Sequence, residues 1–311
     1  MISKGQFVIH VLPRVAWSWE EFVARTPRNS VALDGMVRGG PRLDVANRRF
    51  NFDHHDGVVR DATMSTAMQV YVALKGGITQ AFGNETVHLW INDTDQDTSH
   101  AVWFLLRNAD FEGTKSVPHV SRHLAINDKL DVTGGSWPMK LDRRIVRQHV
   151  WVFERYTTLR KTGALAVATE AQLEDNLEAN LRRLDLFLMN QGEESEPDIR
   201  SDILYRGPRF LMADEIGGSE ARWHLFSNGM DAFVNVVARR PDGRLVCSIG
   251  RRSSYIPFPV MGLYDDLNDA EGLTRETGWG GSDIVGGSSR LLGTGLPIDE
   301  IRRIVLRRLA A

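Results

Sequence analysis

The first third of the chain alternates between short strand-like runs and helix-like stretches, and this alternation constrains the fold more than any other feature. The strand-like runs are rich in β-branched, aromatic and other apolar residues, and they occupy residues 7–12, 30–35, 50–55 and 86–92. The stretches with helical spacing of apolar residues are 17–25, 63–77 and 98–109. Strands that alternate with helices predict an α/β fold with a parallel sheet and helices on both faces.

Acidic and histidine residues follow these strands at the points where the strands end. Asp34 closes the second run, Asp53, His54 and His55 close the third, and Asp93 follows the fourth. In open parallel sheets the ligand site lies outside the carboxyl ends of the strands, so we expect these side chains to converge. Carboxylates and neutral imidazoles are ligands that suit a cation such as Mn²⁺. The pattern therefore predicts a divalent metal site at one edge of the sheet.

The bulk composition excludes several classes of protein. The net charge is −2, so no overall positive field attracts long nucleic acid or an anionic membrane. Cys247 is the only cysteine, which excludes an internal disulfide and a cysteine-based zinc cage. The N-terminal apolar run is too short for a signal peptide, and no stretch is long enough to span a membrane. We expect a cytoplasmic protein.

The rest of the chain changes character twice. Residues 169–191 have a capping-box start at Thr169 and Gln172 and one apolar face, which predicts a long helix. Residues 192–198 are polar and contain a proline, which is typical of a linker. Beyond it we predict strands and a final helix, at residues 222–228, 232–240, 244–252 and 297–309, with a Pro-Asp-Gly hairpin turn between the last two strands. The predicted domains are 1–138 (α/β, metal-binding), 139–200 (helical connector and linker) and 201–311 (smaller, α+β).

Several pieces of sequence, taken in order, carry a resemblance to a known superfamily. They are Asp34 after the second strand, the Phe-Asp-His-His run ending at His55, the Ser-Thr-Ala run that starts ten residues later at Ser65, and Asp93-Thr94 after the next strand. In this order they resemble the DHH phosphoesterases. This superfamily includes exonucleases, oligoribonucleotide and cyclic-dinucleotide phosphodiesterases, and manganese-dependent pyrophosphatases.

The C-terminal part resembles the accessory domain that accompanies these enzymes. That domain has a strand ending in Ser-x-Arg-Ser and, later, a glycine-rich turn. The residues of this chain that fall on the pattern, and that the resemblance implies as substrate-binding, are Arg251, Arg252, Ser253, Gly280, Gly281, Ser282, Asp283, Gly286 and Gly287. Backbone N–H groups of such a turn can hold a phosphate, and arginine offers a planar fork for it. Trp279 beside the turn is a candidate for stacking on a base.

The resemblance also implies roles for the N-terminal residues. Asp34 would bridge two metal ions, His54 would bind one of them, and Asp93 would complete the metal cage. His55 would face the substrate, and Asp53 would orient a histidine from outside the coordination shell. The implied cofactor is one or two Mn²⁺ or Mg²⁺ ions.

The first motif of the superfamily is altered in this chain. Arg14 and Ala16 stand where two metal-binding aspartates are expected after the first strand. One interpretation is that this metal site has decayed. The other is that Asp93, Asp95 and Asp97 supply replacement carboxylates, because Asp95 with Ser99 four residues later mimics the missing pattern. Carboxylates at a helix start can also serve only to offset the helix dipole.

Two functions follow from these alternatives. The first is a metal-dependent phosphoesterase that hydrolyses a small phosphate ester, a short oligonucleotide or a cyclic dinucleotide by metal-activated water. The second is a catalytically degenerate protein of the same kind that binds a nucleotide and regulates. Neither function requires a membrane or long nucleic acid, and a homodimer is possible.

Overall fold

The computed structural model describes residues 1–310, and the chain forms two compact units. The first unit comprises Met1–Val132, Arg143–Tyr156 and Ala168–Glu196, and the second comprises Thr133–Asp142, Thr157–Val167 and the chain from Pro197 onward. The segment predicted as a connector, 139–200, thus contributes to both units. Among the described residues, no helix is long and apolar enough to cross a membrane.

The first unit is built on a six-stranded sheet. Its strands are β1 (Ile2–Lys4), β2 (Phe7–Val11), β3 (Ser30–Leu33), β4 (Arg42–Asp44), β5 (Arg49–Phe52) and β6 (Val87–Ile91), in the spatial order β1-β2-β6-β3-β5-β4. The four central strands are parallel, as predicted. The prediction of a wholly parallel sheet is wrong at the edges, where β1 and β4 run antiparallel. Each edge strand is joined to its neighbour by a short hairpin, which permits only antiparallel pairing.

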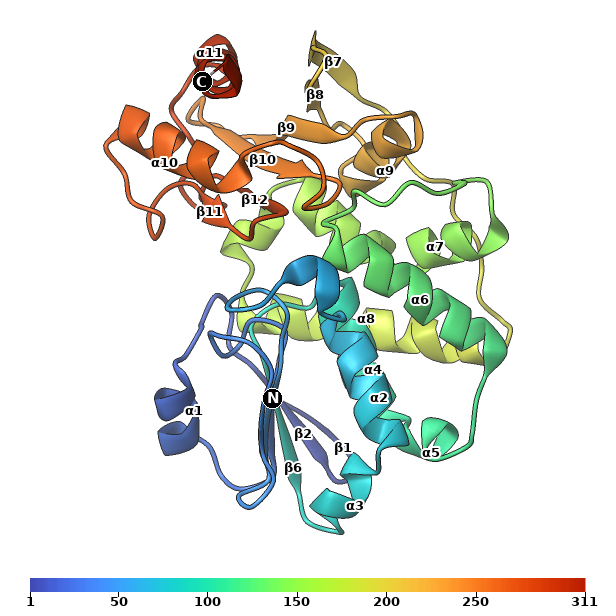
Figure 1. The fold of residues 1–311 in the computed structure, drawn as a ribbon. Coiled ribbons are helices and arrows are strands. Elements are labelled where there is room, and N and C mark those ends of the chain that lie inside the picture. The colour runs from blue at the N-terminus through green and yellow to red at the C-terminus, as the bar shows by residue number, and fades with distance from the viewer. Residues whose placement is uncertain (311) are drawn as a thin grey trace. The chain divides into compact units, whose positions relative to one another are not determined.

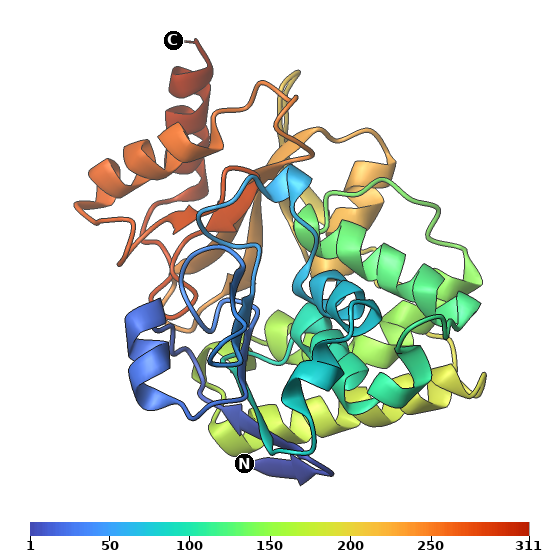
Figure 2. The same ribbon diagram turned by 60° about the horizontal axis from the view of Figure 1, so that its bottom comes forward.

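Helices lie on both sides of this sheet, but unequally. In Figures 1 and 2, α1 (Trp19–Arg25) lies on one side, whereas α2 (Thr66–Lys75), α4 (Gln96–Leu106) and α8 (Glu170–Leu188) lie on the other. The remaining helices that contribute to this unit are α3 (Ile78–Phe82), α5 (Asn108–Phe111), α6 (Pro118–Val132) and the first part of α7 (Arg144–Lys161). The capping box predicted at the start of α8 is present at Thr169 and Gln172.

The strand register brings the predicted acidic residues to one edge of the sheet. Leu33 pairs with Phe52, and Ala32 pairs with Trp90. Asp34 and Asp53 therefore leave neighbouring parallel strands at the same level. All of β3 and residues 50–52 of β5 are buried, and this packing holds the edge in place.

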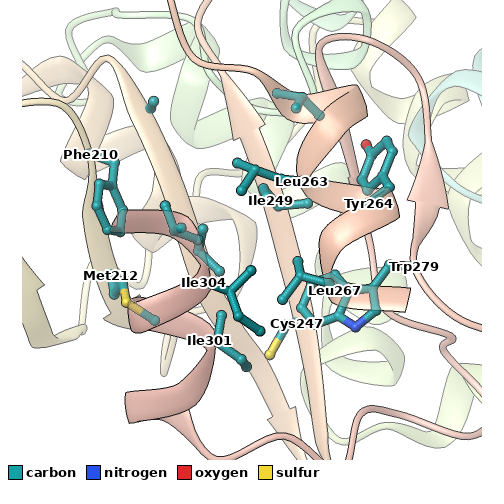
Figure 3. Packing of buried hydrophobic residues seen from close by; sticks show 14 of the residues in the cluster. Phe210, Met212, Cys247, Ile249, Leu263, Tyr264, Leu267, Trp279, Ile301 and Ile304 are labelled. Atoms are coloured by element: carbon teal, nitrogen blue, oxygen red, sulfur yellow. The ribbon is translucent and has the colours of Figure 1, made fainter. Parts of the chain in front are cut away.

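The second unit has its own six-stranded sheet. Its strands are β7 (Asp202–Arg206), β8 (Leu211–Asp214), β9 (Ala232–Arg239), β10 (Leu245–Arg251), β11 (Gly280–Gly281) and β12 (Val285–Gly287), in the order β11-β12-β10-β9-β8-β7. The predicted β9–β10 hairpin is confirmed. Its helices are α9 (Ser219–Ser227), α10 (Val260–Glu271) and α11 (Ile298–Ala310). Side chains from β10, α10 and α11 form one apolar core, which includes Cys247, Leu263 and Ile304 (Figure 3).

The strand predicted at residues 222–228 is wrong, because this segment belongs to helix α9. The residues Arg222, Trp223, Leu225 and Phe226 are all buried. A short run that is buried nearly throughout has no clear period, so its spacing cannot separate a strand from a helix. The aromatic residues favoured the strand prediction, but tertiary packing favours the helix.

A buried ion pair ties α9 to the sheet of the second unit. The guanidinium of Arg222 donates to both carboxylate oxygens of Glu215, at 2.6 and 2.8 Å, and to the carbonyl oxygen of Gly134 at 2.9 Å. Asn235 donates a further hydrogen bond to Glu215. Because both charged groups are buried, loss of one partner leaves an uncompensated charge in the interior.

We predict that Arg222→Met lowers the free energy of unfolding by about 3–5 kcal/mol, because it leaves Glu215 charged and buried. The matched control is Arg303→Met, which breaks the exposed pair with Glu300 and costs less than about 1 kcal/mol. Urea denaturation of both variants measures the difference. Equal stability of the two variants would contradict the structural role assigned to Arg222.

Candidate metal site

Two groups of side chains at the carboxyl edge of the first sheet could hold a metal ion. The first group is Asp34, His54 and His55, and the second is His54, Asp97 and Asp131. Within each group the candidate ligand atoms lie within 4.8 Å of one another. His54 belongs to both, so the two groups adjoin. The members come from the ends of β3 and β5, the first turn of α4 and the last turn of α6.

Asp34 occupies an unusual backbone conformation directly after β3. Its φ is 54°, in the left-handed region, and such a conformation costs about 1–3 kcal/mol for a residue other than glycine. Its N–H donates to the carbonyl oxygen of Phe52, which fixes the turn. Its carboxylate accepts hydrogen bonds from the hydroxyls of Thr66 and Thr98, at 3.1 and 2.7 Å. The carboxylate is therefore held in one orientation inside the protein.

His54 and Asp131 make a short buried contact between two atoms that could each bind a metal ion. Nε2 of His54 lies 2.6 Å from Oδ2 of Asp131, and both atoms are inaccessible to solvent. Neither atom has a hydrogen-bond partner of acceptable geometry. Neighbouring ligands on an octahedral cation with bonds of 2.0–2.1 Å are about 2.9 Å apart. Two orphaned polar atoms at this separation are the arrangement that a shared cation would satisfy.

Asp97 is fully buried and is oriented from two sides. Its carboxylate accepts from the backbone N–H of Ala67, at 3.2 and 3.3 Å, and from Nδ2 of Asn127 at 2.7 Å. Ala67 lies in the first turn of α2, where N–H groups have no partner within the helix. The start of α2 thus stabilises a negative charge on Asp97.

Asp131 lies in the last turn of α6, where a negative charge gains nothing from the helix dipole. Arg60, itself buried, donates to the carbonyl oxygens of Asp131 and Val132, each at 2.8 Å. Burial alone would raise the pKa of Asp131, but the nearby charges of His54 and Arg60 hold it below the usual range. Asp131 is therefore ionised at neutral pH.

His55 differs from His54 because its side chain is 41% exposed. Its Nδ1 lies 2.7 Å from Oδ1 of Asp53 and 3.6 Å from Oδ1 of Asp34. Burial opposes the charged form, but the charges of Asp34 and Asp53 prevail and raise the pKa of His55 to about 9. Asp53 also accepts from the backbone N–H groups of His54 and His55, so it fixes the turn and the ring together.

The buried carboxylates of this region lie close enough to disfavour the charged form of one another. Burial, together with the charges of neighbouring aspartates, raises the pKa of Asp34 and of Asp97, and it raises the pKa of Asp95 to about 7. Buried like charges are unfavourable unless a cation or a proton compensates them. A divalent cation would offset the negative charge of these carboxylates, which Arg60 and His55 compensate only in part.

The structure brings together some predicted ligands and separates others. Asp34 and His54 lie in the two groups, as expected of metal ligands, and Asp53 and His55 lie beside them. Asp95 caps α4 by accepting from the N–H of Thr98, and it interacts electrostatically with the groups. Asp93 belongs to neither group, and its carboxylate accepts from the hydroxyl of Tyr156 at 3.0 Å.

Asp131 and Asp97 are the members that sequence reasoning undervalued. The sequence predicts Asp97 only as an alternative ligand, which the helix dipole explains equally well, and it does not predict Asp131 as a ligand. Asp128 and Asp131 are three residues apart at the end of a helix, where acidic residues are unfavourable. That violation of helix electrostatics is the signal that could have identified Asp131.

The residues of the altered first motif have other contacts. Arg14 donates to the carbonyl oxygen of Ala168 at 2.8 Å. The ring of His10 stacks on Trp90, with centroids 3.9 Å apart, and its Nε2 lies 3.0 Å from Nδ1 of His88.

The predicted substrate-binding residues lie together in the second unit. Nε of Arg251 donates to the carbonyl oxygen of Asp283 at 3.0 Å, and Arg252 pairs with Asp231 at 2.7 Å. The carbonyl oxygen of Ser253 accepts from the N–H of Ile256. Ser282 lies in the turn between β11 and β12, where its hydroxyl accepts from the N–H groups of residues 284 and 285.

Close packing of the backbone leaves no room for a side chain at two glycines of this turn, and the backbone conformation disfavours one at a third. A Cβ on Gly286 would lie 2.2 Å from the carbonyl oxygen of Gly280, and a Cβ on Gly287 would lie 2.1 Å from that of Cys247. Gly281 has a φ of 138°, which side chains rarely adopt. The prediction that Trp279 stacks on a base is wrong, because Trp279 is fully buried and donates to Glu271 (Figure 3).

Comparison of the chain with models of protein families, with curated proteins and with solved structures finds no match in any of the three.

We predict that Asp34→Asn stabilises the metal-free protein by about 0.5–2 kcal/mol, because it removes one buried negative charge. The hydroxyl of Thr98 can still donate to the remaining oxygen, and that of Thr66 can accept from the new amide while it donates to the carbonyl oxygen of Phe52, so the packing is kept. The same variant should lose the stabilisation that Mn²⁺ gives the wild type. Thermal unfolding with Mn²⁺ and with chelator measures both effects, with exposed Asp110→Asn as the control. Destabilisation of the metal-free variant would contradict the charge argument.

We also predict that the metal-free protein becomes less stable as the pH rises from about 4 to about 7. The pKa of Asp95 is about 7 in the folded chain and near 4 when unfolded, so the folded state holds the extra proton in this window. Asp95→Asn should flatten this slope, since asparagine caps a helix as well as aspartate does. Urea denaturation at several pH values measures the slope, and an unchanged slope in the variant would contradict the assignment.

Proposed function

We propose that this protein is a divalent-metal-dependent phosphoesterase whose metal centre is formed by Asp34, His54, Asp97 and Asp131. The observation that carries the proposal is the contact between His54 and Asp131, two buried ligand atoms without hydrogen-bond partners. The proposed ligands are three carboxylates and one imidazole. Mg²⁺ usually keeps several waters and binds through one or two carboxylates, so a site with this many protein ligands, one of them an imidazole, suits Mn²⁺ better. We therefore propose Mn²⁺ as the preferred ion.

A divalent cation held by these residues would supply Lewis-acid chemistry, polarising a phosphoryl oxygen and lowering the pKa of a bound water. The chain itself contributes orientation. Thr66 and Thr98 hold Asp34, and Ala67 and Asn127 hold Asp97, so these carboxylates keep their directions with no rearrangement on binding.

His55 is the residue we propose to face the substrate. Its ring is partly exposed, and its Nδ1 is held by Asp53, which directs Nε2 away from the carboxylates. With a pKa of about 9, the ring is protonated at neutral pH. It can therefore donate a hydrogen bond to a phosphoryl oxygen and a proton to the departing oxygen. Asp53 is a positioning residue for His55 in this proposal.

The order of these groups along the chain supports the resemblance to the DHH phosphoesterases. Asp34 after one strand and His54 and His55 after the next form one cluster, as that resemblance implies. We propose that the arginines and the glycine-rich turn of the second unit bind the phosphate of a small ester, a short oligonucleotide or a cyclic dinucleotide. Arg251 and Arg252 are each close to an aspartate, so a phosphate must compete with these carboxylates.

A binding protein without catalysis is the second candidate. Arg14 and Ala16 replace the expected aspartates, and Arg14 is engaged with Ala168. Such a protein would bind a nucleotide equally well with chelator present, which separates it from the enzyme.

The experiment is hydrolysis of bis-p-nitrophenyl phosphate and of a cyclic dinucleotide, with Mn²⁺, with Mg²⁺ and with chelator. We predict turnover with Mn²⁺ that falls more than about 100-fold in His54→Ala and Asp131→Asn, since loss of a supporting residue alone costs about 10–100-fold. His224→Ala, in the second unit, is the control and should keep wild-type activity. Turnover that persists in His54→Ala, or that chelator leaves unchanged, would contradict the proposal.

A further inference from the structure

Three histidines form a hydrogen-bonded chain inside the first unit, apart from the metal groups. Nε2 of His100 on α4 lies 3.0 Å from Nδ1 of His123 on α6, and Nε2 of His123 lies 3.2 Å from Nδ1 of His149 on α7. Nδ1 of His100 lies 2.9 Å from the carbonyl oxygen of Gln96. Each of the three histidines is at most 1% exposed to solvent. The chain thus joins three helices through their imidazoles alone.

The carbonyl at one end sets the direction of every hydrogen bond in the chain. A carbonyl oxygen only accepts, so Nδ1 of His100 carries the hydrogen and Nε2 of a neutral His100 must accept. Nδ1 of His123 is then the donor to His100, and by the same reasoning Nδ1 of His149 is the donor to His123. The neutral chain therefore has one arrangement, in which each ring is the Nδ1–H tautomer.

The surroundings keep these rings neutral. The ring of His123 packs against Phe153 and Phe187, and Phe153 also contacts His100 and His149. Burial lowers the pKa of His100 to about 4 and that of His149 to about 3, and burial with the neighbouring rings lowers that of His123. The three rings are therefore neutral at neutral pH.

The position of the chain relates it to the metal groups. His100 is three residues after Asp97 on α4, and His123 is four residues before Asn127 on α6, which is one helical turn in each case. Asn127 donates to Asp97 at 2.7 Å. Two hydrogen bonds, one turn apart, therefore cross between α4 and α6 and fix how far one helix can slide along the other.

We propose that His100 and His123 are positioning residues that hold α4 against α6, so that Asp97 and Asp131 stay close enough to bind one cation. This inference rests on the proposed metal centre. Asp97 is carried by α4 and Asp131 by α6, and the negative charge that both carboxylates need in order to bind a cation pushes the two helices apart. The hydrogen bond between the two imidazoles opposes that repulsion. His149 lies on α7, and its hydrogen bond with His123 joins α7 to α6. It makes no contribution to the contact between α4 and α6.

The test compares variants that differ in which bond they break. His100→Asn keeps a donor near the Gln96 carbonyl and loses the link to His123, and His123→Leu removes both links. His149→Leu is the matched control, because it removes a buried imidazole and leaves the α4–α6 bond intact. We predict that the dissociation constant for Mn²⁺ rises about 10–100-fold in the first two variants and less than about twofold in His149→Leu.

A second measurement does not depend on metal. The N–H of Ala67 donates to Asp97, so its hydrogen exchange in the metal-free protein reports the position of that carboxylate. We predict exchange at Ala67 that is at least about tenfold faster in His100→Asn and His123→Leu, but not in His149→Leu. Nitrogen-15 NMR of the wild type should show all three rings as Nδ1–H tautomers.

The outcomes separate this inference from the proposed function. Wild-type protein that binds no Mn²⁺ would end the proposed function, and exchange at Ala67 would still decide whether the histidines position Asp97. Wild-type exchange in folded His100→Asn and His123→Leu would overturn the inference. An Nε2–H tautomer at His100, or an equal loss of Mn²⁺ affinity in His149→Leu, would also overturn it.

Discussion

Repulsion among buried carboxylates is the constraint on which the site depends. Asp34, Asp95, Asp97 and Asp131 are close enough to influence one another's pKa, and burial removes the water that would screen them. The chain opposes this repulsion with hydroxyl and amide donors and with Arg60, yet the ligand atoms of His54 and Asp131 have only each other as a close partner. An arrangement that is costly to fold and incompletely satisfied is typical of a functional site, since such strain persists only where the surrounding structure holds it.

The fold explains how separate parts of the chain reach this point. Parallel pairing of β3 with β5 places Asp34 and His54 at one edge of the sheet. Asp97 and Asp131 arrive on α4 and α6, whose relative position depends on contacts between helices. The sheet therefore fixes half of the site, and helix packing fixes the other half.

This division accounts for what could be predicted from the sequence. The central strands, the helices α2, α4 and α8 and the hairpin of the second unit follow from local periodicity and turn residues, and so does the placing of Asp34 and His54. Asp131 could be suspected only from its unfavourable place at the end of a helix, because its approach to His54 depends on how α6 packs against the rest of the unit. Asp93 was favoured by its position after a strand, but Tyr156 on α7 draws it into a different contact. Helix α9 was predicted as a strand because nearly all of its residues are buried, so the spacing of its apolar residues indicates neither a helix nor a strand.

The most direct measurement is an anomalous difference map, at the manganese absorption edge, from crystals grown with Mn²⁺. The account predicts a peak within bonding distance of Nε2 of His54 and of carboxylate oxygens of Asp97 and Asp131, with Asp34 as a further ligand. A map without a peak at these atoms, in which His54 and Asp131 instead share a well-formed hydrogen bond, would contradict the account.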